Sequence, residues 1–190
     1  MITDFTEQLA ECLRTLRGCE ALLPTAAEAA GVIVASLKAG GTVAFCGNGG
    51  SAAQAQHFAA ELVGRFRRER APFHAIALNT DSSILTAIGN DYGFDEVFSR
   101  QVQGLLRAGD VLVGLSTSGN APNVCTAFAA GRRLGVRLVG LTGRDGGHLA
   151  PLCDLELRVP SDLTARTQEA HLFLGHLLCD AVEAALADWA

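Results

Sequence analysis

Residues 42–58 read TVAFCGNGGSAAQAQHF and carry the signal on which the fold prediction depends. The stretch opens with a short apolar segment, residues 42–46, that suits a buried strand. A glycine-rich turn follows at residues 47–51, and we expect the helix after it to run to about residue 67. A strand, a glycine turn and a helix in immediate succession predict one unit of an α/β fold.

The same alternation continues to the end of the chain. Predicted strands occupy residues 74–78, 111–115, 137–141 and 155–159, and predicted helices occupy residues 82–88, 95–106, 122–134 and 164–186. This pattern predicts an α/β fold in which helices flank both faces of a central five-stranded parallel sheet, a three-layer α/β/α sandwich. The loops that follow the strands should then gather along one edge of the sheet.

Two more helices, residues 3–17 and 25–38, precede the sheet without a strand between them. We expect this N-terminal helical extension, residues 1–40, to pack on partner subunits. Because the sequence has no repeat, linker or low-complexity tract, residues 1–190 are predicted to form a single domain.

The composition narrows the class of protein. A net charge of −5 argues against a nucleic-acid binder, which usually carries a basic face. The six cysteines do not form a CxxC pair or a zinc-finger spacing, so we interpret them as thiols of a reducing compartment. The N-terminus is acidic and lacks an apolar signal-peptide core, and no apolar run approaches the roughly 20 residues that span a bilayer. We therefore expect a cytoplasmic protein without a membrane segment.

Two of the predicted strand-to-helix loops have the composition of an anion site, residues 47–51 (GNGGS) and 116–120 (STSGN). Glycine lets the backbone approach a ligand closely, and free N–H groups at a helix start attract a phosphate. The alternative is that Ser51 and Ser116 only cap helices. Neither loop matches a dinucleotide fingerprint or a Walker loop, so a nucleotide is not indicated. A third loop, residues 142–147, is interpreted as structural.

Four residues have the chemistry and the spacing of a metal site. His57 and Glu61 are four residues apart, and Gln168 and His176 are eight apart, so each pair lies on one helical face. Imidazoles and a carboxylate suit a zinc-like ion, and an amide oxygen can complete its coordination. Taken singly, each residue has the alternative interpretation of an ordinary core or surface side chain.

Four arginines follow this helix, at positions 65, 67, 68 and 70. Such a run is usually a solvated helix end, but it could also attract a phosphate-bearing substrate. We expect Arg65 to be the functional one, because it would lie one turn beyond Glu61 on the same side of the helix.

Together, these loops and helices resemble the sugar isomerase (SIS) domain family and, within it, the phosphoheptose isomerases. The matching segments cover most of the chain after residue 40 and lie at residues 46–66, 87–102, 109–124, 141–147 and 166–176. The family often has serine where this chain has Ala121, which removes one possible phosphate donor.

The resemblance implies a homotetramer with active sites between subunits and one Zn²⁺ per site, held by His57, Glu61, Gln168 and His176. It implies isomerisation of sedoheptulose 7-phosphate to D-glycero-D-manno-heptose 7-phosphate through an enediol, with Glu61 as base and His176 as acid. The substrate contacts that it implies are Asn48, Gly49, Gly50, Ser51, Glu61, Arg65, Asn90, Asp91, Ser116, Thr117, Ser118 and Gln168.

The resemblance leaves a competing hypothesis. SIS domains also occur as non-catalytic modules, and residues 75–88 look like a relative that binds the bacterial replication initiator protein. A module that senses a sugar phosphate would also keep the loops. Neither needs Glu61 together with His176, so their presence favours the enzyme. Arabinose 5-phosphate and hexulose phosphate isomerases are further alternatives for the substrate.

Overall fold

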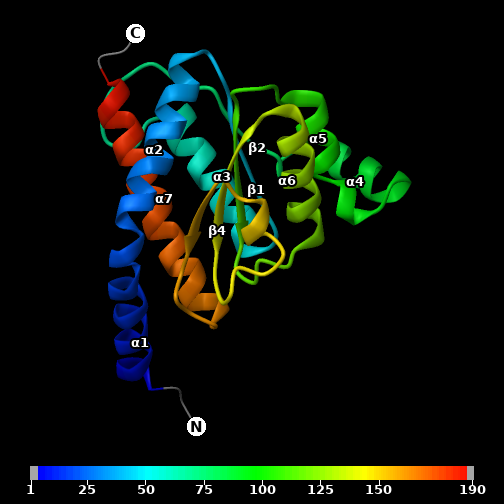
Figure 1. Ribbon diagram of the computed structural model, residues 1–190. Helices are drawn as coiled ribbons and strands as arrows, with labels where there is room; N and C mark the ends of the chain where they lie inside the picture. Colours follow the sequence, from blue (N-terminus) through cyan, green and yellow to red (C-terminus); the bar gives the residue numbers. More distant parts are fainter. Residues whose placement is uncertain (1–3, 188–190) are drawn as a thin grey trace.

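A five-stranded parallel sheet forms the centre of the computed structural model, which describes residues 4–187 (Figure 1). β1 (Val43–Gly47) and β3 (Val111–Ser116) lie at its middle and are buried throughout, which explains their uninterrupted apolar sequence. The sheet order is β2-β1-β3-β4-β5, completed by β2 (Ala75–Ala77), β4 (Arg137–Thr142) and β5 (Leu155–Arg158). The predicted five-stranded parallel sheet is confirmed.

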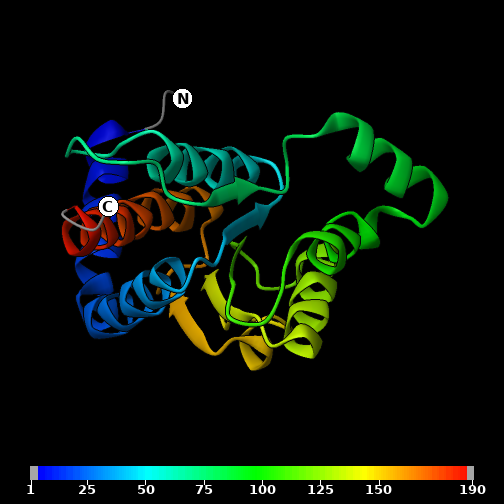
Figure 2. The same ribbon diagram turned by 90° about the horizontal axis from the view of Figure 1, so that it is seen from above.

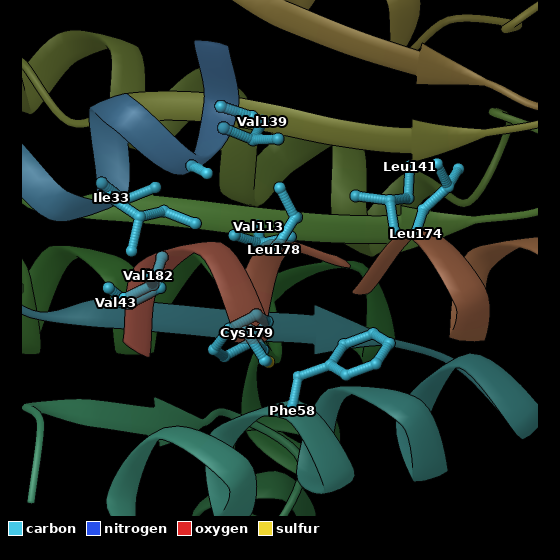
Figure 3. Close-up of a cluster of buried hydrophobic side chains, with 14 of the residues drawn as sticks. Ile33, Val43, Phe58, Val113, Val139, Leu141, Leu174, Leu178, Cys179 and Val182 are labelled. Carbon is cyan, nitrogen blue, oxygen red and sulfur yellow. The ribbon is translucent and has the colours of Figure 1, made fainter. Parts of the chain in front are cut away.

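Helices cover both faces of this sheet, as the three-layer prediction requires (Figure 2). One face packs against α2 (Leu23–Lys38), α3 (Gly50–Val63) and α7 (Thr164–Leu186). The other packs against α5 (Ser99–Leu105) and α6 (Pro122–Leu134). Figure 3 shows part of the first core, in which side chains of α2, α3 and α7 meet those of the strands.

The N-terminal helices form one nearly continuous stretch, because the 3-10 turn η1 (Cys19–Leu22) joins α1 (Phe5–Gly18) directly to α2. The sequence predicted an interruption at residues 18–24. α1 runs beyond the end of the sheet in Figure 1 and exposes Phe5, Leu9 and Leu13. These residues recur every four positions and form an apolar stripe along the helix.

This stretch also bears on the expectation that the chain has no membrane segment. By length and composition alone, the helical run Phe5–Lys38 is sufficient to cross a bilayer. The core helix of a soluble protein meets the same criterion. Five α2 residues are buried in the core beside the sheet, as in such a core helix: Ala26, Ala29, Ala30, Ile33 and Leu37. The expectation of no membrane segment stays a prediction.

α3 ends at Val63, four residues before its predicted end near residue 67. Gly64 leaves the helical conformation with a ψ of −105°. From there the chain turns across α7, and the Phe73 amide donates to the carbonyl of Leu62. Arg65 therefore does not lie on a helix, and the prediction that it extends the Glu61 face is wrong.

The predicted helix at residues 95–106 is divided in the structure. A 3-10 turn, η2 (Phe94–Glu96), precedes α5, because the Ser99 hydroxyl donates to the Glu96 carbonyl and competes with helical bonding. α4 (Ser82–Asp91) precedes this turn and projects from the body in Figure 2 without a buried residue. A last 3-10 turn, η3 (Ala150–Leu152), leads into β5.

Candidate functional site: a phosphate cleft beside a His/Glu cluster

A cleft of about 320 Å³ opens where β1 and β3 end. After β1 the chain crosses to β2 on one side, and after β2 it returns to β3 on the other side, so the two loops diverge. In open parallel sheets this switch point is the usual ligand site. The cleft is lined by both predicted anion loops and by α7, with the residues Asn48, Gly49, Gly50, Ser51, Leu115, Ser116, Thr117, Ser118, Ala121, Thr164 and Gln168.

The helices that begin at this cleft lack side-chain caps. Gly49 is the N-cap of α3, and its φ of +56° explains why glycine is needed at that position. Ala121 is the N-cap of α6, and its side chain cannot accept a hydrogen bond. The alternative that Ser51 and Ser116 are helix caps is therefore not supported, and both helix starts point their dipoles at the cleft.

Asn79 and Asn123, which the sequence analysis did not select, hold the first loop in place. The side chains of Asn48 and Asn123 exchange two hydrogen bonds, of 2.8 and 2.9 Å. The Asn79 amide nitrogen donates to the carbonyl of Gly47 at 2.6 Å. Asn123 is 1% exposed, so its amide has been withdrawn from water to make this contact. Nothing in the local sequence distinguishes Asn123 from an ordinary first-turn residue.

The third loop, residues 142–147, packs against the second: a Cβ at Gly119 would lie 2.0 Å from the carbonyl oxygen of Gly146, and the next two residues of the chain add hydrogen bonds. The Leu149 amide donates to the carbonyl of Gly119 at 2.9 Å, and the His148 amide donates to the side chain of Asn120 at 3.1 Å. These contacts agree with the structural interpretation of this loop.

About two helical turns along α3 and α7 lies a cluster of His57, Glu61 and His176. The two imidazole Nε2 atoms are 2.8 Å apart, and Nε2 of His57 is 3.4 Å from a carboxylate oxygen of Glu61. One ligand atom from each residue can be chosen so that all three lie within 4.8 Å of one another. His57 and Glu61 share a helical face as predicted, and the packing of α7 on α3 adds His176.

The surroundings of His176 favour its neutral form. Burial lowers the pKa of His176, the neighbouring His57 lowers it further, and the carboxylate of Glu61 partly opposes this. Phe58 and Phe66 place their rings 6.3 and 5.4 Å from the His176 ring. Neutral imidazole nitrogens and a carboxylate that converge on one point are the donors that zinc prefers, so these residues fit a zinc ion.

Gln168 lies at the cleft. A Cβ at Gly50 would lie 2.6 Å from the side chain of Gln168. Gln168 precedes His176 by about two turns of α7. An offset of eight positions corresponds to about 12 Å along the helix axis. Within residues 4–187, no hydrogen bond joins this amide to the His/Glu cluster, and its role as a fourth ligand stays a prediction.

Four predicted substrate residues do not line the cleft of the same chain: Glu61, which belongs to the His/Glu cluster, and Arg65, Asn90 and Asp91. Arg65 is exposed and pairs with Glu69 at 3.8 Å. Asn90 and Asp91 end the projecting helix α4, where the Asn90 amide donates to the Asp91 carboxylate at 2.7 Å. These placements do not test a site shared between subunits.

The chain matches known proteins over nearly its whole length. The SIS domain family profile matches residues 4–143. The phosphoheptose isomerase of Rhodospirillum rubrum is 57% identical over 185 residues, which cover 97% of each chain, and that of Pelobacter propionicus is 51% identical over 98% of this chain and 99% of its own. The structure of the phosphoheptose isomerase of Neisseria gonorrhoeae superposes with a TM-score of 0.90 at 47% identity, covering 95% of this chain and 97% of that one.

Proposed function

Since the chain belongs to the SIS domain family and, within it, to the phosphoheptose isomerases, we propose that it converts sedoheptulose 7-phosphate to D-glycero-D-manno-heptose 7-phosphate. This reaction would be the first step of bacterial heptose biosynthesis, which supplies lipopolysaccharide and other glycans. The observation that carries the proposal is the placement of the His/Glu cluster on the two helices, α3 and α7, that line the phosphate cleft.

The separation of the two regions suits an extended sugar phosphate. His57 in the cluster follows Gly50 in the cleft by seven positions of helix, about 10 Å along the axis. A phosphate held by the two uncapped helix starts would leave the other end of the sugar near the cluster. The hydroxyls of Ser51, Ser116 and Ser118 supply further donors to the phosphate oxygens.

The chemistry requires an acid and a base at neighbouring carbons. An enediol forms when C1 of the ketose loses a proton and the C2 carbonyl oxygen gains one, and the aldose follows when C2 gains a proton and the C1 hydroxyl loses one. We assign Glu61 as the base that takes the C1 proton and His176 as the acid that delivers the C2 proton. Burial and the neighbouring His57 lower the pKa of His176, which makes its protonated form a stronger proton donor.

The cofactor proposed for this site is one Zn²⁺, held by His57, Glu61 and His176, with Gln168 as a further ligand. Bound there, zinc would act as a Lewis acid that polarises the oxygens of the sugar. The donor set supports this assignment. Glu61 would then serve both as ligand and as base, and its carboxylate would have to move between these roles during turnover.

We further propose a homotetramer in which active sites lie between subunits. The apolar stripe of α1 supports packing of residues 1–40 on partner subunits, since monomers rarely leave such stripes uncovered. Asn90 and Asp91 end α4 and do not line the cleft of their own chain, which supports a site completed by a neighbouring subunit. All six cysteines are free thiols, which supports a cytoplasmic location. We propose that the chain binds a small sugar phosphate and that it binds neither a nucleic acid nor a membrane.

The test is aldose formation from sedoheptulose 7-phosphate after treatment with a chelator and after re-addition of zinc. We expect turnover that is lost with the chelator and returns with zinc. Glu61→Gln should lower kcat at least ~100-fold, because a positioned base contributes about that much. The matched control is Glu69→Gln, which removes an exposed carboxylate eight residues later and should retain wild-type kcat. A well-folded, zinc-loaded chain without turnover would instead favour the non-catalytic SIS module.

A further inference from the structure

A fully buried carboxylate lies on α7 outside the proposed zinc site. The Glu183 side chain is 0% exposed. Its two oxygens accept hydrogen bonds from three consecutive backbone amides, those of Phe66, Arg67 and Arg68, at 2.7 to 2.8 Å. These amides belong to the segment that leaves α3, where the backbone has no helical partners. One side chain of α7 therefore accepts hydrogen bonds from all three consecutive backbone N–H groups of another segment.

Arg70 completes this unit. Its side chain is 1% exposed, and its Nε lies 3.4 Å from Glu183. The two Nη atoms donate to the carbonyls of Glu61, Leu62 and Gly64 at 2.8, 2.9 and 3.1 Å. These are carbonyls at the C-terminal end of α3, which lack helical donors of their own. Arg70 thus caps the helix that carries Glu61 and is itself held by Glu183.

Glu183 and Arg70 connect to the proposed acid and base: Glu183 through Phe66 to His176, and Arg70 directly to the backbone of Glu61. The Phe66 amide is bonded to Glu183, and the Phe66 ring lies 5.4 Å from the ring of His176 with 32° between their planes. Glu183 follows His176 by seven residues, two turns along one face of α7. The backbone carbonyl of Glu61 is bonded to Arg70.

We propose that Glu183 is a positioning residue for the isomerase: through the amides of residues 66–68 it holds the Phe66 ring against His176, and through Arg70 it fixes the end of α3 that carries Glu61. A buried ion pair seldom stabilises a fold more than an apolar pair of the same size, so its use here is positional. Burial raises the pKa of Glu183, but the three amides and Arg70 outweigh it and the pKa is lowered overall. The side chain is therefore charged at neutral pH.

The proposal rests on the proposed isomerase function, and its first test compares two variants of the zinc-loaded full chain. Glu183→Gln keeps the size of the side chain but replaces one acceptor by a donor that faces backbone amides. We expect kcat to fall about 10- to 100-fold, since displacements of about 1 Å in catalytic groups cost this much, while KM changes less than twofold. Asp180→Asn is the matched control. Asp180 lies one turn earlier and is 35% exposed, and its ion pairs within residues 4–187 are with the side chains of Arg67 and Arg68. The kcat of this variant should therefore stay within twofold of wild type.

A second readout does not depend on turnover. In the chelator-treated full chain labelled with ¹⁵N-histidine, the Phe66 ring current should shift the ring protons of His176, identified by comparison with His176→Gln. Glu183→Gln should move these resonances toward their positions in Phe66→Leu, and Asp180→Asn should leave them unchanged. Phe66→Leu retains the amide bonds to Glu183 and should also lower kcat, which keeps the test valid if Glu183→Gln does not fold.

The outcomes separate the two proposals. Wild-type chain without turnover, but with the expected His176 shifts, overturns the proposed function and leaves the positional role of Glu183 in place. A folded Glu183→Gln chain with wild-type kcat and unchanged His176 resonances overturns the role of Glu183. So does an equal loss of kcat in Asp180→Asn, which would indicate a general effect of charge.

Discussion

Substitution of Gly175 by alanine should force apart the two helices that carry the His/Glu cluster. Gly175 lies on α7 directly against the ring of Phe58 on α3, which is itself 1% exposed. A Cβ at Gly175 would stand 2.0, 2.3 and 2.6 Å from three atoms of this ring. Ordinary contact begins near 3.4 Å, so the ring or the helix would have to retreat by about 1.4 Å. Figure 3 shows Phe58 among the residues of this core.

The core offers little room for such a movement. The cavity lined by Phe58 and Gly175 measures about 10 Å³, which is close to the space of one water molecule. Overpacking of a filled core costs typically 1–3 kcal/mol, and alanine in place of glycine within a helix returns about 1 kcal/mol. We therefore expect Gly175→Ala to lower the free energy of unfolding by up to about 2 kcal/mol. Because Phe58 also packs on His57 and His176, kcat should fall as well.

The assay is urea denaturation of the full chain at fixed protein concentration, with the slope m compared between variants. Gly31→Ala is the matched control, since Gly31 is helical and a Cβ there would meet no atom within 4 Å. That variant should gain up to about 1 kcal/mol. In the double variant Gly175→Ala/Phe58→Leu, the loss should be smaller than the sum of the single losses. Equal stability of Gly175→Ala and Gly31→Ala, or strict additivity in the double variant, would refute the steric argument.

Three other predictions concern the cleft and the core. Ala121→Ser should supply the missing N-cap of α6 and stabilise the chain by about 1 kcal/mol, a rise in Tm of about 2–4 °C in circular dichroism; an unchanged or lower Tm would contradict it. Asn123→Ala should release Asn48 and raise KM about 5- to 10-fold with little change in kcat, and an equal effect on both constants would speak against a binding role. Burial lowers the pKa of His171 from 6.5 to about 4, although its bond to the Thr142 carbonyl opposes the shift. Since the unfolded chain binds a proton that the folded chain does not, the free energy of unfolding should fall as pH drops from about 6.5 to 4, and His171→Gln should reduce this slope in urea titrations. An identical slope in the variant would exclude His171 as its source.

Much of the fold followed from local patterns. Apolar runs located the five strands to within a few residues. The reason is clearest for β1 and β3, which are buried throughout and must therefore be apolar throughout. The two anion loops were predicted from composition and do line one cleft. His57 and Glu61 could be paired from their spacing, because residues four apart share a helical face.

Errors arose where distant segments determine local structure. Arg65 was expected to extend the Glu61 face, but α3 ends at Val63. The backbone beyond that point is held by Glu183, more than 110 residues later in the sequence. Helix formers alone do not reveal such an ending, because the competing hydrogen bonds come from a side chain on another element.

By itself, the sequence determined which residues share a strand, a turn or a helical face, since those relations depend on backbone periodicity and on the conformational preferences of a few residues. Only the tertiary structure decided which faces meet. The packing of α7 on α3 brings His176 to 2.8 Å from His57, across 119 positions of sequence, and the same packing buries Glu183 against the end of α3. Periodicity specifies that a face is apolar or polar but not its partner, which is chosen by the burial and hydrogen bonding of the whole chain.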